Sequence, residues 1–114
     1  MDALEIVLLY DYYGDLLTDR QKECFEMRYY QDLSLGEIGE MLGISRQAVC
    51  DNLTRTEALL RKMEENIGCV SRDLRSRRAM KRILENAEKL CAYPDDTVSQ
   101  WAKQIASAAR ELEE

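Results

Sequence analysis

Hydrophobic residues recur at helical spacing along most of the chain, and this pattern predicts six helices. Apolar positions three, four or seven residues apart fall on one face of a helix. Only five glycines and one proline interrupt the 114 residues, and long stretches without these residues favour helices. The predicted helices span about residues 3–13, 18–30, 35–42, 46–67, 72–92 and 98–112. We therefore expect an all-α fold.

Capping residues mark the ends of these helices. Serine or threonine followed three residues later by glutamate or glutamine forms a capping box, which satisfies free N–H groups at a helix start. Such boxes begin at Thr18, Ser34 and Thr97. Single caps are expected at Ser45 and Ser71, and helix ends at Gly14, Gly43 and Gly68. The chain is thus divided into helices by its own local signals.

Residues 34–67 have the pattern of a helix-turn-helix: a short helix, a tight glycine turn and a long helix capped by serine. The two helices of such a motif pack close together, so a small residue is needed where they touch. Gly39 stands at that place, and close packing would compensate the roughly 1 kcal/mol that glycine costs inside a helix. The expected small core between the helices comprises Ile38, Leu42, Ile44 and Val49.

The exposed side of the long helix is the candidate nucleic-acid-binding surface. It comprises Ser45, Arg46, Gln47, Cys50, Asp51, Thr54 and Arg55. Arginine and glutamine are the side chains best suited to contact base edges or phosphates. Two amphipathic helices joined by a glycine turn also occur in ordinary helical bundles, so a purely structural role stays open.

The length is that of a single domain, with a helix-turn-helix bundle at 1–68 and a pair of further helices at 69–114. Those two helices have apolar stripes of their own, and Trp101 is expected in a core or an interface. The stripes either pack on the first bundle or pair with a second copy, as in a homodimer. Five tyrosines are expected in the core and rim of the first two helices, with base stacking as the alternative. They are Tyr10, Tyr12, Tyr13, Tyr29 and Tyr30.

Charge is distributed unevenly along the chain. The net charge is −6, which argues against a simple DNA-coating protein because affinity for nucleic acid depends on phosphate neutralisation. Residues 1–71 carry 7 basic and 14 acidic side chains, whereas residues 72–89 carry 7 basic and 3 acidic ones. The candidate phosphate contacts in this basic segment are Arg72, Arg75, Arg78, Lys81 and Arg82. They either grip a nucleic-acid backbone, that of an RNA helix in particular, or form a solvated face that balances an acidic neighbour.

The sequence shows no catalytic set. Histidine is absent, which removes the commonest general base near neutral pH, and there is no glycine-rich phosphate loop. The four cysteines are not spaced as metal-binding pairs and are expected to be reduced thiols. We expect no enzyme activity, no metal or other cofactor and no small-molecule substrate. Without a membrane-length apolar run or a signal-peptide start, the expected location is the cytoplasm, with no membrane partner.

Particular stretches resemble known helix-turn-helix proteins. Residues 17–21, 29–30 and 33–39 resemble the promoter-binding domain of bacterial sigma factors. Ser45–Val49, Asp51–Leu53 and Arg55–Glu57 are more specific and resemble the YlxM-like family, small proteins encoded beside the signal recognition particle genes in Gram-positive bacteria. The resemblance covers about residues 3–67 well. The family pattern usually has tyrosine where this chain has Cys50, and a basic residue is common where it has Thr54.

The resemblance implies a sigma-factor-type bundle of three or four helices with two additional C-terminal helices. It also implies a regulatory protein of the signal recognition particle pathway, with the particle's RNA, DNA or a particle protein as partner. Two other hypotheses stay open. One is a promoter-binding transcription regulator, which would act as a dimer on two half-sites. The other is a protein–protein interaction module, which the acidic first half of the chain favours.

Overall fold

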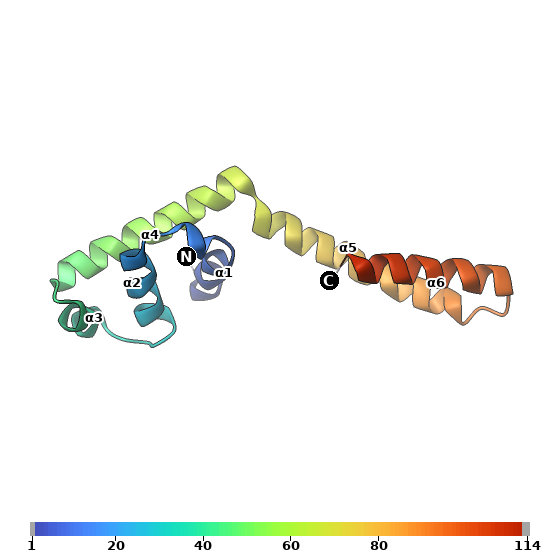
Figure 1. The fold of residues 1–114 in the computed structure, drawn as a ribbon, viewed down its shortest axis with the longest axis horizontal. Helices are drawn as coiled ribbons and strands as arrows, with labels where there is room; N and C mark the ends of the chain where they lie inside the picture. The colour runs from blue at the N-terminus through green and yellow to red at the C-terminus, as the bar shows by residue number, and fades with distance from the viewer. Residues whose placement is uncertain (1, 113–114) are drawn as a thin grey trace. The chain divides into compact units, whose positions relative to one another are not determined.

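The structure of this chain, a computed structural model that describes residues 2–112, is built from helices. In chain order they are α1 (Ala3–Tyr13), the short 3₁₀ helix η1 (Gly14–Leu16), α2 (Asp19–Tyr29), α3 (Leu35–Leu42), α4 (Arg46–Ile67), α5 (Cys69–Cys91) and α6 (Asp96–Glu111), as Figure 1 shows. No strand occurs within residues 2–112, and the expected all-α fold is confirmed. In the same range, every helix is too short or too polar to span a bilayer.

The expected caps hold the starts of α2, α3 and α4. The Gln21 N–H donates to Thr18 Oγ1 at 3.2 Å, and the Thr18 N–H donates to Gln21 Oε1 at 3.0 Å. Ser34 and Glu37 make the same reciprocal pair, both bonds at 3.1 Å. Ser45 Oγ accepts one N–H of the first turn of α4 at 3.0 Å. Because these side chains satisfy N–H groups that lack a partner inside the helix, the three helices begin where the sequence predicts.

The expected cap of α5 is wrong, since α5 begins at Cys69 and not after Ser71. The Cys69 N–H donates to the Tyr13 hydroxyl at 3.0 Å, and the Val70 N–H donates to Glu64 Oε1 at 3.0 Å. The Tyr13 hydroxyl in turn donates to Glu64 Oε1 at 2.6 Å. These acceptors come from α1 and α4, so no local capping motif at residue 71 was needed to start the helix.

The expected capping box of α6 is also wrong. The N-cap is Asp95, whose Oδ1 accepts the N–H groups of Thr97 at 2.9 Å and Val98 at 3.1 Å. A carboxylate accepts two N–H groups and interacts favourably with the positive end of the helix dipole. Asp95 therefore starts α6 two residues earlier than a cap at Thr97 would.

The chain forms two compact units, residues 1–70 and 71–114, and the division lies inside α5. In the first unit, α4 packs against α1, α2 and α3 (Figure 1). One buried cluster of this unit comprises Ile6, Leu9, Tyr13, Leu17, Phe25, Leu60 and Val70. The ring of Tyr10 stacks on Phe25 with centroids 4.1 Å apart, and Tyr29 lies 4.5 Å from the same ring. The tyrosines of α1 and α2 thus form core and rim, as expected.

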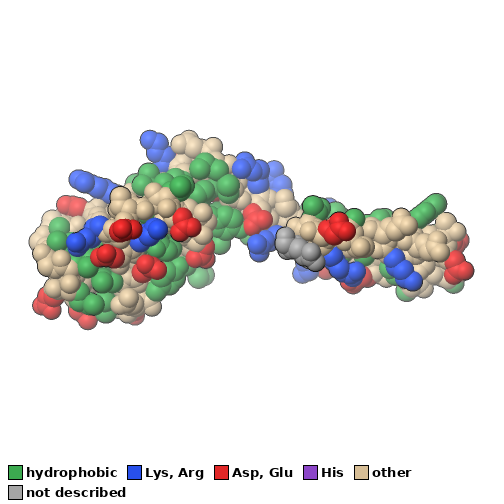
Figure 2. Space-filling model, viewed as in Figure 1, with side chains coloured by type: hydrophobic (Ala, Val, Ile, Leu, Met, Phe, Trp, Pro, Cys, Tyr) green, Lys and Arg blue, Asp and Glu red, His purple; other side chains and the backbone are tan. Residues whose placement is uncertain are grey.

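The second unit is a hairpin of α5 and α6 in which the fully buried side chains are small. They are Ala87, Ala102, Ala106 and Ala109. The Ser99 hydroxyl donates to the Cys91 carbonyl at 3.2 Å and ties the two helices near their connection. Trp101 is 63% exposed, so it is not a core residue of this hairpin, and its place in an interface stays a prediction. Figure 2 shows hydrophobic side chains reaching the surface along the hairpin.

Candidate nucleic-acid interface

The start of α4 is positioned by close backbone contact with α3. A Cβ atom added to Gly39 would lie 2.7 Å from the Ile44 carbonyl oxygen and 3.5 Å from the Arg46 nitrogen. The Ile44 N–H donates to the Gly39 carbonyl at 3.0 Å, and Gly43 between them has φ 68°, the left-handed region that glycine adopts without strain. The expected close approach at Gly39 is confirmed, and it fixes the path of the chain into α4.

A second buried cluster holds α3 and the start of α4 together. It comprises Cys24, Ile38, Val49 and Leu53, with Leu42 and Ile44 partly buried against it. The expected core of the helix-turn-helix is thereby confirmed, with Cys24 of α2 and Leu53 of α4 as additional members. Burial raises the pKa of the Cys24 thiol. The motif is a rigid part of the first unit because its inner face is closed by side chains from three helices.

The side of α4 opposite this buried cluster carries the side chains that the sequence predicts to bind nucleic acid. Six of them are exposed and one, Cys50, is half-buried. The exposed ones are Ser45, Arg46, Gln47, Asp51, Thr54 and Arg55. The Ser45 side chain is already used as the helix cap. The structure therefore places this set on the side of α4 away from the buried Val49 and Leu53, with Arg46 and Arg55, nine residues apart, on opposite flanks of that side.

Gln47 and Asp51 form one coupled pair. Gln47 Nε2 donates to Asp51 Oδ1 at 3.0 Å across one turn of the helix. The bond leaves the second N–H and the carbonyl oxygen of the Gln47 amide free, which are the two groups that pair with an adenine edge. This bond is not among those predicted from the sequence. The i, i+4 spacing of a glutamine and an aspartate on a helix would have predicted it.

The two arginines of this face are available to an anion. Arg46 is the first residue of α4, no acidic side chain lies in that first turn, and the positive end of the helix dipole is there. Within residues 2–112, neither Arg46 nor Arg55 takes part in an ion pair. This end of α4 is therefore locally positive, although the first 71 residues carry an excess of acidic side chains.

The basic segment of α5 is a separate surface, because it belongs to the second unit. Its expected contacts are all exposed: Arg72, Arg75, Arg78, Lys81 and Arg82. Arg77 pairs with Asp73 at 3.3 Å. In the part of the chain that is described, Arg75, Arg78 and Arg82 form no ion pair, and their spacing places them near one face of α5. This face of α5 is suited to contact a phosphate backbone.

Comparison with known proteins agrees with this architecture. The family model described as "Putative helix-turn-helix protein, YlxM / p13 like" matches residues 2–98. A UPF0122 protein of Thermoanaerobacter sp. (strain X514) is 45% identical over 113 residues, which is 99% of this chain and 95% of the relative. A UPF0122 protein of Geobacillus kaustophilus is 39% identical over 106 residues, 93% of this chain and 89% of the relative. The chain therefore belongs to the YlxM/p13-like family of helix-turn-helix proteins.

Proposed function

We propose that this protein is a nucleic-acid-binding regulator that uses the first three turns of α4 as its recognition surface. The observation that carries the proposal is the exposed set Arg46, Gln47, Thr54 and Arg55 on a helix whose start is fixed by the contact between Gly39 and Ile44. Rigid placement of such side chains lowers the entropic cost of binding.

Duplex DNA is the ligand that suits α4 best. The major groove of B-form DNA is wide enough for an α-helix, whereas the major groove of an RNA helix is deep and narrow. In a helix-turn-helix, the N-terminal residues of the second helix contact base edges. Gln47 has a free amide edge for an adenine, and Arg46 and Arg55 can contact guanine or phosphate.

The signal recognition particle pathway is the setting that we propose for this regulator. It is supported by the resemblance of residues 45–57 to a family encoded beside the genes of that particle. A second candidate ligand, the RNA of the particle, is favoured by the unpaired arginines of α5 rather than by α4. Recognition of folded RNA depends mostly on its backbone and shape, which a row of arginines can serve.

Replacing Arg46 or Arg55 by alanine is expected to weaken binding to duplex DNA. Each loss should cost about 1–3 kcal/mol, or about 5- to 150-fold in Kd. The measurement is fluorescence anisotropy with labelled duplex DNA at low salt. Lys62→Ala is the matched control, because Lys62 is exposed on the same helix but lies beyond the recognition surface. Equal losses for Arg46→Ala and Lys62→Ala would contradict the proposed surface.

Neutralising Arg75, Arg78 and Arg82 together by glutamine is expected to reduce binding to the particle RNA by at least about tenfold and to lower its salt dependence. The control variant carries Arg20→Gln, Lys62→Gln and Lys103→Gln, which changes the net charge equally at other exposed positions. An unrelated structured RNA serves as the second probe. If both triple variants bind the particle RNA equally, a specific role of α5 is refuted. Absence of binding to every nucleic-acid probe would instead support a protein–protein module.

A further inference from the structure

The hairpin of α5 and α6 has an apolar face that no side chain of the hairpin covers. Five large side chains contribute to it: Ile83 at 43% exposure, Leu90 at 42%, Trp101 at 63%, Ile105 at 46% and Leu112 at 77%. Together they expose on the order of 500 Å², a size at which patches on soluble proteins commonly serve a partner. We name these five residues the hairpin face.

Helical geometry places the five residues on the same side of the hairpin. On α5, Ile83 and Leu90 each stand one position before a partly buried residue that faces α6. On α6, Trp101 and Ile105 likewise each stand one position before a buried alanine. The two helices run in opposite directions, and each faces the other from the opposite side. These two reversals cancel, so the residue one position before an inward-facing residue lies on the same side of the hairpin in both helices. The hairpin face is therefore continuous across both helices.

The inside of the hairpin buries little apolar surface. Its fully buried side chains are alanines, larger ones such as Leu84 and Val98 are only partly buried, and the five residues of the hairpin face are exposed. Burial of a leucine, isoleucine or tryptophan contributes several times more than burial of a methyl group. A two-helix hairpin of this kind gains most of its hydrophobic stabilisation only when another layer covers its outer face.

The charges of the hairpin indicate what that layer is. Residues 72–82 of α5, at the open end of the hairpin, carry six basic side chains and one acidic one. Residues 85–96, at the closed end, carry four acidic side chains and one basic one. These two segments are thus oppositely charged, although Glu88, one of the four acidic residues, already pairs with Arg110 of α6 at 3.6 Å. Consider a second copy related by a two-fold axis that passes through the middle of the hairpin face. The basic end of each copy would then lie against the acidic end of the other.

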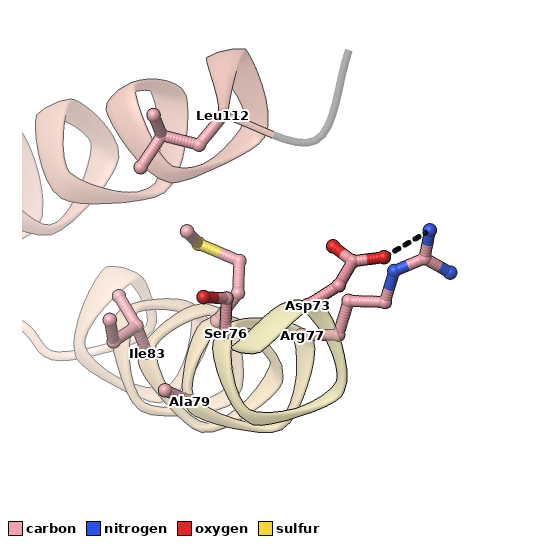
Figure 3. Close-up of a pocket in the computed structure, with 7 residues that line it drawn as sticks. Asp73, Ser76, Arg77, Ala79, Ile83 and Leu112 are labelled. Atoms are coloured by element: carbon pink, nitrogen blue, oxygen red, sulfur yellow. Dashed lines mark ion pairs between the residues drawn. The ribbon is translucent and has the colours of Figure 1, made fainter. Parts of the chain in front are cut away.

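The shape of the open end fits the same arrangement. A hollow lies there between the helices, with Ser76 and Ile83 of α5 on one side and Leu112 of α6 on the other, as Figure 3 shows. At the opposite end, Leu90 and Tyr93 are exposed. Antiparallel pairing places the closed end of one copy, with these apolar side chains, over the hollow of the other.

We propose that the hairpin face is a homodimer interface, in which the α5–α6 hairpins of two copies pair antiparallel into a four-helix bundle. In such bundles, apolar stripes from all four helices form the core, which supplies the burial that one hairpin lacks. The dimer carries two copies of the α4 recognition surface, but the inference does not depend on nucleic-acid binding.

The test is the molar mass of the full chain in solution, measured by sedimentation equilibrium at tens of micromolar. Wild-type protein is expected at twice the chain mass of 13.2 kDa. Ile105→Glu places a charge in the middle of the hairpin face and is expected to weaken the dimer at least about 100-fold. Gln104→Glu adds the same charge at the neighbouring exposed position, off the face, and should leave the dimer intact.

Two further readouts keep the test decisive if Ile105→Glu perturbs the fold. The emission of Trp101, the one tryptophan of the chain, should shift to longer wavelength as the wild type is diluted. Added salt should weaken the dimer, since opposite charges meet in the antiparallel pairing. A wild-type monomer at tens of micromolar, or a dimer insensitive to Ile105→Glu with unchanged Trp101 emission, would overturn the interface. A dimer that salt strengthens would overturn the antiparallel arrangement.

Discussion

Gly39→Ala is expected to destabilise the first unit by about 1–3 kcal/mol, although alanine normally stabilises a helix. The added methyl group would stand 2.7 Å from the Ile44 carbonyl oxygen, which is backbone and cannot rotate away. Relief requires α3 to move from the turn before α4, and this displaces Arg46 and Gln47. We therefore also expect a loss of duplex DNA affinity of about tenfold or more, because small displacements of contact residues are costly. Urea unfolding followed by tyrosine fluorescence measures the stability, since five of the six tyrosines lie in the first unit.

Gly36→Ala provides the matched control on the same helix. A Cβ atom there has Ser34 Oγ at 4.0 Å as its nearest neighbour, so the substitution should stabilise α3 by about 0.4–1 kcal/mol and leave DNA binding unchanged. Opposite signs for the two substitutions would show that packing decides the effect at Gly39, since the helix and the chemical change are the same. Two stabilising substitutions would contradict the close approach of α3 and α4.

Raising the pH from 10 to 12 is expected to destabilise the first unit strongly. Burial, reinforced by neighbouring carboxylates, raises the pKa of Tyr10, Tyr13 and Tyr29 from 10 to about 12. Below pH 10 the folded and unfolded chains both keep these protons. Between pH 10 and 12 the unfolded chain loses them first, so stability falls as the pH rises and is lost as the folded pKa is passed. Each tyrosine contributes on the order of 2 kcal/mol to this loss.

The variant Tyr13→Phe isolates the contribution of the most deeply buried of these tyrosines. At neutral pH it should be less stable than wild type, because the Cys69 N–H loses its acceptor and Glu64 loses a donor. Between pH 10 and 12 its stability should decline less steeply, because phenylalanine cannot ionise. Urea unfolding at a series of pH values measures both. Identical slopes for the variant and the wild type would refute an elevated pKa of Tyr13 in the folded protein.

The parts of the fold that the sequence predicts are those determined by neighbouring residues. The boxes at Thr18 and Ser34 and the cap at Ser45 use residues within one helical turn, so α2, α3 and α4 begin as predicted. Gly39 is similar, because the short turn at Gly43 brings α3 against the start of α4.

The parts that could not be predicted depend on contacts between distant residues or on competition between caps. The start of α5 depends on Tyr13, 56 residues earlier in the chain. At α6, Asp95 and Thr97 are both good capping residues, and the sequence gives no measure of which one prevails. Helical periodicity places Trp101 on the apolar stripe of α6. Periodicity does not show which part of that stripe faces α5 and which part faces outward. For the candidate site, periodicity predicts which side chains lie on the exposed side of α4, and the i, i+4 spacing of Gln47 and Asp51 is also enough to predict the bond between them.

The hydrogen bonds at the start of α5 also determine how this protein can be divided into fragments. Val70 is buried in the core of the first unit, and its N–H is bonded to Glu64. A fragment ending at Gly68, the apparent boundary in the sequence, would lack the side chain of Val70 and leave the Tyr13 hydroxyl without its donor from residue 69. Any recombinant fragment of the helix-turn-helix unit should therefore extend through Val70, and for protection of the new C-terminus a further turn of α5 is preferable.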